Sequence, residues 1–143
     1  ADLRRPFDAG SSTTLGNALL APTRIYVKTV LALRDRIRIK GMAHITGGGL
    51  TLNVPRMLPD SVQARIERAS WQRPRVFEWL QRNGDVADDE MHRVFNCGIG
   101  MVLAVAANDA ESAIDALNAA GESACDIGEI IPRADGAPPT VVV

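Results

Sequence analysis

The run of three consecutive glycines at positions 47–49 constrains this chain more than any other feature of its sequence. Glycine loses more conformational freedom on folding than other residues, so a compact domain keeps such a run where the backbone needs unusual dihedral angles or a close approach. A short strand-like segment, Met42 to Thr46, precedes the run, and residues able to start a helix follow it. Backbone N–H groups in that setting can converge on an anion such as a phosphate. The alternative is a flexible turn without a ligand.

Size and charge narrow the class of protein. A chain of 143 residues fits one domain, which buries roughly two-thirds of the surface of its unfolded chain. Hydrophobic residues make up 46% and charged residues 23%, which is ordinary for a soluble globular protein. The net charge of -1 does not indicate a basic surface for nucleic-acid binding. No run reaches the ~18 apolar residues that a membrane span needs. We therefore expect a cytoplasmic protein with no nucleic-acid or membrane partner.

The metal-ligating residues are few and scattered. Cys97 and Cys125 are too few for a disulfide framework and lack the spacing of metal ligands. His44 and His92 are too far apart in sequence for a local metal motif. The sequence therefore predicts no metal site, and a buried, unreactive Cys is favoured over a nucleophilic one.

Hydrophobic periodicity predicts an alternation of helices and strands. Proline suits a first helical turn, so a helix is expected to begin near Pro22-Thr23, with Ile25 on its apolar face. Asp88 is expected to cap a later helix, and Asn108 is expected to cap the helix that Gly121 ends. The other expected elements are helices over 50–57, 74–82, 88–95 and 110–120, and strands over 42–46, 62–67, 99–106 and 124–131.

This order of elements predicts an α+β fold, a layered α/β sandwich with one mixed sheet of about four strands under its helices. The almost wholly apolar segment 99–106 is typical of a central strand. Residues 1–18 are expected to be a linker or domain boundary, residues 19–131 the domain, and residues 132–143 a tail. The end of that tail, 140–143, is expected either to add an edge strand or to stay loose.

Two junctions between loops and regular elements collect small and polar residues. The first contains His44, Thr46 and the three glycines, with Asn53 and Arg56 close behind. The second runs from Phe95 to Met101 and contains Asn96, Gly98 and Gly100. No Gly-Lys-Ser/Thr ending follows the glycine run, so it is not a P-loop, and the second junction lacks the third glycine of a Rossmann fingerprint.

Each of these residues also has a purely structural interpretation. His44 can be a hydrogen-bonded histidine at a strand, and Arg56 a surface cation. Gly98 and Gly100 can mark a β-bulge.

Several segments together resemble one family, aminoimidazole ribonucleotide synthetase, also called phosphoribosylformylglycinamidine cyclo-ligase. The resemblance runs from about Leu19 to Glu129 and concerns the C-terminal domain only. Leu52 stands where similar proteins usually carry Glu, and His92 where Tyr is usual. The segments that carry the resemblance are Leu19 to Lys28, Ala43 to Leu50, Asn53 to Arg56, Ser70-Trp71, Phe77 to Leu80 and Phe95 to Met101.

The resemblance implies a fold partly like ferredoxin and a role in de novo purine biosynthesis. The family closes the imidazole ring of formylglycinamidine ribonucleotide, using ATP and Mg²⁺ that are bound mainly by an N-terminal domain absent from this sequence. A homodimer is implied for the complete protein, and this chain alone is expected to be inactive. Two alternatives stay open: a domain of a related ATP-dependent phosphoryl-transfer enzyme, and a stand-alone module for ligand binding or dimerisation.

The resemblance also suggests roles for individual residues. Gly47, Gly48 and Gly49 are expected to donate backbone N–H groups to an anionic part of the substrate, with the ribose phosphate as first choice and a nucleotide phosphate as second. Thr46 and Arg56 would support that anion, and Asn53 belongs to the same binding site. His44 would orient the formyl oxygen or shuttle a proton. The opposite wall is expected to contain Asn96, Gly98 and Gly100.

Overall fold

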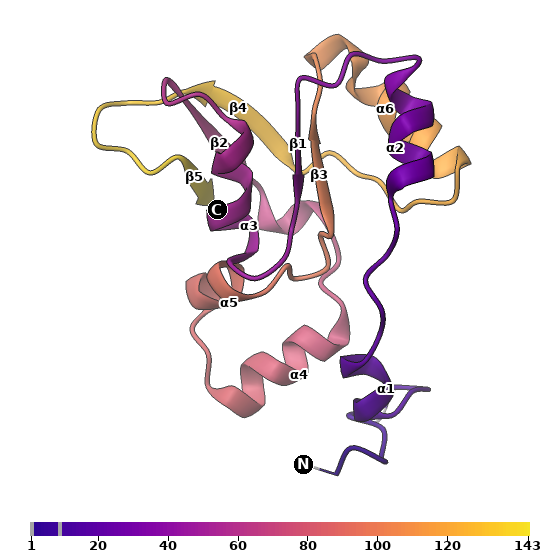
Figure 1. Ribbon diagram of the computed structural model, residues 1–143. Helices are drawn as coiled ribbons and strands as arrows, with labels where there is room; N and C mark the ends of the chain where they lie inside the picture. Colours follow the sequence, from indigo (N-terminus) through magenta and orange to yellow (C-terminus); the bar gives the residue numbers. More distant parts are fainter. Residues whose placement is uncertain (1, 9) are drawn as a thin grey trace.

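The computed structural model describes residues 2–8 and 10–143, and its strands form two sheets (Figure 1). In the first sheet, β1 (Gly41–His44) pairs antiparallel with β3 (Met101–Ala104). In the second, β2 (Val62–Ile66) lies between β4 (Gly128–Pro132), which is antiparallel, and β5 (Thr140–Val142), which is parallel. The predicted mixed α+β fold is confirmed, although the described strands divide between two sheets. The end of the tail does form an edge strand.

The helices lie in two groups around these sheets. Helices α2 and α6 lie side by side next to the β1–β3 sheet, whereas α3, α5 and α4 lie near its other end, toward α1 and the N-terminus (Figure 1). Short 3-10 turns connect several of the elements. The bounds are α1 (Leu15–Leu19), α2 (Val27–Arg34), α3 (Gly49–Asn53), η1 (Val54–Met57), η2 (Arg68–Ser70), α4 (Arg75–Gly84), α5 (Asp88–Val94), η3 (Ala107–Asp109) and α6 (Ala110–Ala119).

The expected helix start near Pro22-Thr23 is wrong. Helix α2 begins at Val27, and Ile25 is 82% exposed and not on a buried face. Arg24 explains this: its guanidinium donates to the carbonyl of Gly121 at 2.6 Å and pairs with Glu122 at 2.6 Å. These two bonds tie the preceding segment to the loop after α6, where it does not continue the helix.

The expected helix caps are wrong at both N-termini. The N-cap of α5 is Ala87 and that of α6 is Asp109, and neither makes a side-chain capping bond. The carboxylate of Asp88 accepts hydrogen bonds from arginine side chains and is not available to the backbone. By contrast, Gly121 follows the end of α6 with φ +86°, a left-handed conformation that glycine adopts without strain.

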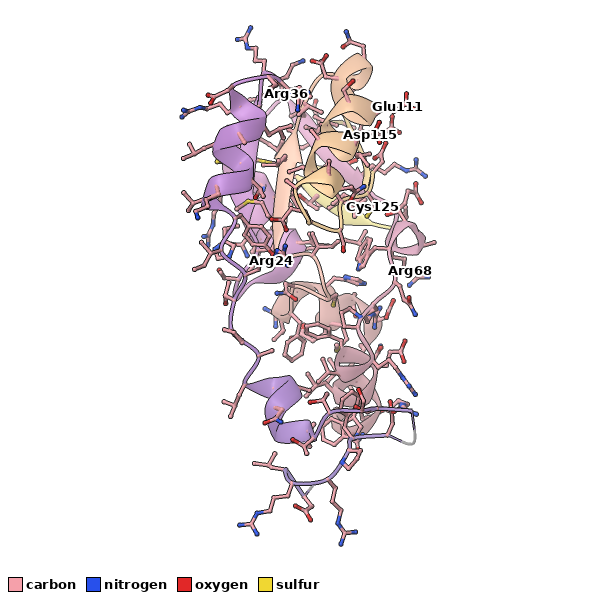
Figure 2. All side chains as sticks on the ribbon, turned by 90° about the vertical axis from the view of Figure 1, so that its right-hand side faces the viewer. Arg24, Arg36, Arg68, Glu111, Asp115 and Cys125 are labelled. Atoms are coloured by element: carbon pink, nitrogen blue, oxygen red, sulfur yellow. The ribbon has the colours of Figure 1, made fainter. Side chains whose placement is uncertain are left out.

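The core lies where β1, α3, η1 and β2 meet. Ile45, Leu50 and Val54 are almost completely buried there, together with Ala43, Ala64 and Ile66. Leu50 and Val54 lie one helical turn apart, so the same apolar face anchors both α3 and η1. On the outside of α6, Glu111 and Asp115 point into solvent (Figure 2). Because Leu50 of α3 belongs to this core, the core fixes where α3 starts, and with it the position of the glycine loop.

Candidate functional site

The glycine loop, residues 46–49, connects β1 to α3. Gly48 has φ +98° and Gly49 has φ +55°, both in the left-handed region that side chains strain. A Cβ at Gly49 would also overlap the backbone carbonyl oxygen of His92. Gly47 differs, because among the described residues no atom beyond its two chain neighbours lies within 4 Å of the place where its Cβ would be. Gly48 and Gly49 are thus required by the backbone, whereas Gly47 faces open space.

The hydrogen bonds of the loop show which amides are free. The amide of Gly49 donates to the carbonyl of Thr46 at 3.0 Å, so it is already bonded within the loop. Within residues 2–8 and 10–143, the amides of Gly47 and Gly48 have no hydrogen-bond acceptor. Two of the three amides expected to bind an anion are therefore available.

Asn53 supports the glycine loop through hydrogen bonds from its side chain to backbone carbonyls. Its side chain is buried, with 2% of the residue exposed. Its Nδ2 lies 2.8 Å from the carbonyl oxygen of Gly49, 3.2 Å from that of Gly47 and 3.4 Å from that of Thr46. The donor group of Asn53 is thus occupied by the loop, which makes it a supporting residue in this structure.

His44 lies at the end of β1 beside a tyrosine that the sequence-based site omits. Its exposed ring meets Tyr26 edge to face, with ring centroids 6.1 Å apart. The Tyr26 hydroxyl packs against Gly100, where a Cβ would overlap it. Burial, and then the charge of Glu122, raise the pKa of Tyr26, so this hydroxyl stays protonated at neutral pH and can donate a hydrogen bond. The sequence signal for Tyr26 was the segment 22–28, which contains this residue and carries part of the resemblance to the family.

The two glycine-containing junctions are neighbours in space. The amide of Ile45 donates to the carbonyl of Gly100 at 2.9 Å, and Gly49 packs against the carbonyl of Phe95. The opposite wall is itself a tight turn, because the Asn96 side chain accepts from the amide of Gly98 at 3.0 Å. Gly98 has φ +101° and its Cα borders Pro74. The two junctions therefore adjoin in the structure.

Arg56 lies on η1, directly after α3. Its side chain is exposed and makes no ion pair among the residues that the structure describes. A guanidinium without a carboxylate partner is free to bind an anionic ligand in two-pronged fashion. Whether it does so stays a prediction.

A cluster of charged and polar side chains lies around helix α5, which packs against α3. The guanidinium of Arg73 donates to Asp88 at 3.0 Å and to Gln81 at 2.6 Å. The bond from Arg73 is the main cause that lowers the pKa of Asp88 to about 2. The Nε2 of His92 lies 3.5 Å from Arg73. Burial, and then this cation, lower the pKa of His92, so its ring is neutral at pH 7.

This cluster reaches the glycine loop through helix α5. The hydroxyl of Thr51 donates to the carbonyl of His92 at 3.1 Å, and Gly49 packs against the same carbonyl. His92 and Leu52, the two positions at which the sequence is expected to depart from the family that it resembles, both lie against this loop. His92 is buried behind the loop, whereas Leu52 is exposed beside Gly48. His92 therefore belongs to the support of the loop, and Leu52 lies on its accessible side.

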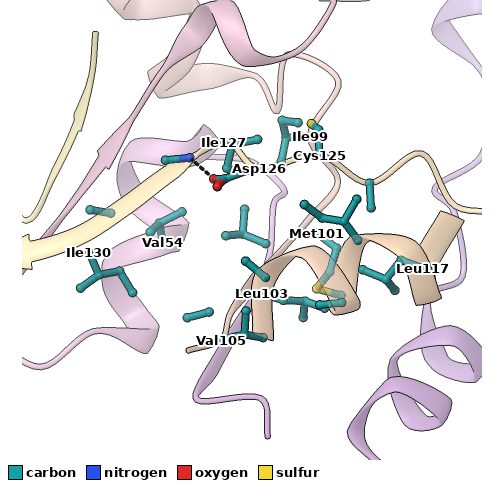
Figure 3. A pocket seen from close by; sticks show the side chains of 18 of the residues that line it. Val54, Ile99, Met101, Leu103, Val105, Leu117, Cys125, Asp126, Ile127 and Ile130 are labelled. Carbon is teal, nitrogen blue, oxygen red and sulfur yellow. Dashed lines mark hydrogen bonds between the residues drawn. The ribbon is translucent and has the colours of Figure 1, made fainter. Parts of the chain in front are cut away.

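An apolar cavity lies apart from the glycine loop. This cavity, which we call the β3–β4 cavity, has a volume of about 690 Å³ and lies between β3, β4 and α6 (Figure 3). Its lining is mainly apolar, and Met101, Leu103, Leu117 and Ile130 are among its residues. An apolar lining does not suit a phosphate, so this cavity is not the predicted anion site.

The described residues form neither a metal-binding cluster nor a membrane-spanning helix. Within residues 2–8 and 10–143, no three His, Cys, Asp or Glu side chains gather closely enough to hold a metal ion. None of the described helices has the length and apolar character needed to cross a bilayer.

These features define a mixed α+β domain that presents a glycine loop where a strand meets a helix. Residues 3–138 match the family described as "AIR synthase related protein, C-terminal domain". The chain therefore belongs to this family.

Three similar proteins have the same name. The chain is 61% identical over 129 residues to the phosphoribosylformylglycinamidine cyclo-ligase of Cupriavidus pinatubonensis, which covers 90% of this chain and 37% of that protein. It is 54% identical over 142 residues to the protein of the same name from Paraburkholderia xenovorans, covering 99% and 39%. The Chromobacterium violaceum protein of that name is 53% identical over 135 residues, covering 94% and 39%. The chain thus spans less than half the length of these curated relatives.

Proposed function

We propose that this chain acts as the C-terminal domain of a phosphoribosylformylglycinamidine cyclo-ligase in purine biosynthesis. The observation that carries the proposal is its identity of 53% or more, over at least nine-tenths of its length, to relatives of that name. The complete protein would be a cytoplasmic homodimer. The chain alone would be inactive, because the nucleotide-binding part of the enzyme would lie in the domain that these relatives carry and this sequence lacks.

The glycine loop would bind the anionic part of formylglycinamidine ribonucleotide. The open amides of Gly47 and Gly48 support this role, since two successive N–H donors without an internal acceptor suit a phosphate oxygen. Arg56 and Thr46, both exposed and close in sequence, would add a charge and a hydroxyl. The ribose phosphate is our first choice of ligand, because it remains unchanged in the reaction and can anchor the substrate.

His44 would act on the reacting end of the substrate. Ring closure requires the formyl oxygen to leave and the amidine nitrogen to attack the same carbon, with loss of a proton. ATP, held with Mg²⁺ by the other domain, would supply the phosphoryl group that turns the formyl oxygen into a leaving group. His44 is exposed at the end of β1 and is steadied by Tyr26, so its imidazole can orient the formyl oxygen or accept the proton. Positioning of this kind would account for much of the acceleration.

A chimera tests this proposal. The segment of the Cupriavidus pinatubonensis protein that matches this chain is replaced by residues 1–143, and ATP-dependent formation of aminoimidazole ribonucleotide is measured. We expect activity in the chimera and none with residues 1–143 alone. A folded chimera that binds the substrate but forms no product would refute the cyclo-ligase proposal and support a ligand-binding module.

A substitution in the same chimera tests the glycine loop. Gly47→Val adds its side chain in open space, so the fold should persist while the amide is shielded from a ligand. Loss of one charge-assisted hydrogen bond is worth about 1.5–3 kcal/mol, so KM should rise roughly 10- to 100-fold. Gly84→Ala, at the end of α4, is the matched control and should leave KM unchanged. An unchanged KM for Gly47→Val would contradict the proposed anion site.

A further inference from the structure

We propose that the β3–β4 cavity receives one additional β-strand, which comes from the part of the polypeptide that the longer relatives carry and this sequence lacks. That strand would pair with β3 on one side and β4 on the other, and so join the two sheets into one. The inference rests on the length of the relatives and on the geometry of the two strands. It does not depend on the ligand of the glycine loop.

The composition of β3 conflicts with its position. Residues 99–107 contain no charged or polar side chain, which is typical of a strand covered on both faces and paired on both edges. In the structure, β3 has one partner among the described strands, β1, and every residue of β3 is only partly buried. A two-stranded sheet is of marginal stability by itself. This strand therefore has the sequence of a central strand and the position of an edge strand.

The free edge of β3 is identified by its register. The amide of Ile45 donates to the carbonyl of Gly100, which makes these residues a hydrogen-bonded antiparallel pair. Hydrogen-bonded and non-hydrogen-bonded pairs alternate along such a ladder. Val102 therefore faces β1, whereas the N–H and C=O groups of Met101 and Leu103 point away from it. Within the described residues, no hydrogen bond satisfies the latter groups.

The free edge of β4 follows from the same argument. The amide of Glu67 donates to the carbonyl of Ile127 at 2.9 Å, and the paired register continues into β4. Glu129 and Ile131 therefore face β2. The backbone groups of Ile130 and the carbonyl of Gly128 point to the opposite side, where the described part of the chain offers them no partner.

Both free edges border the same cavity. Every residue from Met101 to Ala106 and every residue from Glu122 to Ile130 contributes to its lining. Because side chains alternate between the faces of a strand, a cavity lined by consecutive residues lies against the edge and not against one face. Figure 3 shows Leu103 and Val105 on one side of the space and Ile130 on the other.

The cavity also fixes the chemistry of the strand. Ile114 and Leu117 of α6 line the cavity, and so do Val54 and Met57 of η1. An inserted strand would be covered on both faces, so its side chains must be apolar in succession. It should match the four residues of β3 and the five of β4 in length, and proline is excluded because both edges need N–H donors.

The rest of the polypeptide fits this site better than a second copy of the chain. A strand that bonds β3 and β4 at once must have both of its edges free. In the described structure, β1, β2, β3, β4 and β5 each have at least one edge occupied by a neighbour, so an identical folded chain cannot supply such a strand. This chain covers 37% of the Cupriavidus pinatubonensis protein, which leaves most of that polypeptide as the source.

Amide hydrogen exchange tests the proposal. The 143-residue chain is mixed with overlapping synthetic peptides that span the unmatched part of the Cupriavidus pinatubonensis protein, and exchange is followed by NMR. We expect one apolar peptide to slow exchange at Leu103 and Ile130 together, about 100-fold at a concentration 100 times its Kd. The proposal fails if no peptide protects both edges. It also fails if protection arises without peptide and grows with protein concentration, since that indicates pairing between copies.

Two proline variants and one alanine control show whether the backbone is responsible. Leu103→Pro removes the N–H that points into the cavity and keeps the neighbouring bonds to β1, so the peptide should bind at least about 10-fold more weakly. Leu103→Ala keeps the N–H and is the matched control. Ile130→Pro makes the same test on β4, in case Leu103→Pro does not fold. Equal binding of the proline and alanine variants would overturn the proposal.

Discussion

Replacing Asn53 by alanine should destabilise the chain more than any other single polar truncation near the glycine loop. Its side-chain NH₂ has two hydrogens, which three loop carbonyls share at 2.8, 3.2 and 3.4 Å. Two hydrogen bonds contribute about 1 kcal/mol each, and the vacated space in a buried site adds to the loss. We therefore expect Asn53→Ala to lower the free energy of unfolding by about 2–3 kcal/mol.

Urea denaturation measures this loss. With a slope of about 2 kcal/mol per M, the midpoint should fall by roughly 1 M. Exchange at the amide of Gly49 should also accelerate, because that amide donates within the loop that Asn53 holds. The matched control is Asn108→Ala, an exposed residue in η3, which should change stability by less than about 0.5 kcal/mol. Equal effects of the two variants would refute the assignment of Asn53 as the support of the loop.

Three further outcomes follow from the charged and sulfur-containing residues. The pKa of His92 is lowered on folding, so stability should be complete above its unfolded value near 6.5 and fall as the pH drops below it; urea titrations should show this loss disappearing in His92→Gln. The pKa of Asp88 is lowered to about 2, so a second loss, about 1 kcal/mol after screening of this partly exposed group, should appear between about pH 4 and 2 and vanish in Asp88→Asn. A thiol reagent should label the exposed Cys125 in the native chain and leave Cys97 unlabelled, because Cys97 is buried and burial raises its pKa; equal labelling rates would contradict its burial.

Local patterns located most of the regular elements. The alternation over 62–67 identified β2, and the glycine at 121 identified the end of α6, because each signal acts through neighbouring residues along the chain. The glycine run was also interpreted correctly as a loop between a strand and a helix. Which of its amides stay free was not predictable, since that depends on the bond from Gly49 to Thr46 and on the carbonyls that Asn53 occupies.

Two of the errors, at Asp88 and at Arg24, have the same physical cause. Asn108 and Asp88 have the side chains of helix caps, but capping competes with other partners, and Asp88 is bonded to Arg73 from another part of the chain. In the same way, Arg24 binds the loop after α6, and the segment before Val27, which was predicted to be helical, does not form a helix. A preference of a fraction of a kcal/mol in the local backbone is overruled by a charge-assisted bond to a distant residue.

The sequence by itself determined the family, the succession of helices and strands, and the two glycine-containing junctions, because these depend on residue type and spacing along the chain. Only the tertiary structure decided that the junctions adjoin through Ile45 and Gly100, and that Tyr26 stands beside His44. The same holds for the apolar strand β3, which has a free edge on a cavity. Pairings of this kind join residues far apart in sequence, and their free energies depend on which partners the whole fold brings within bonding distance.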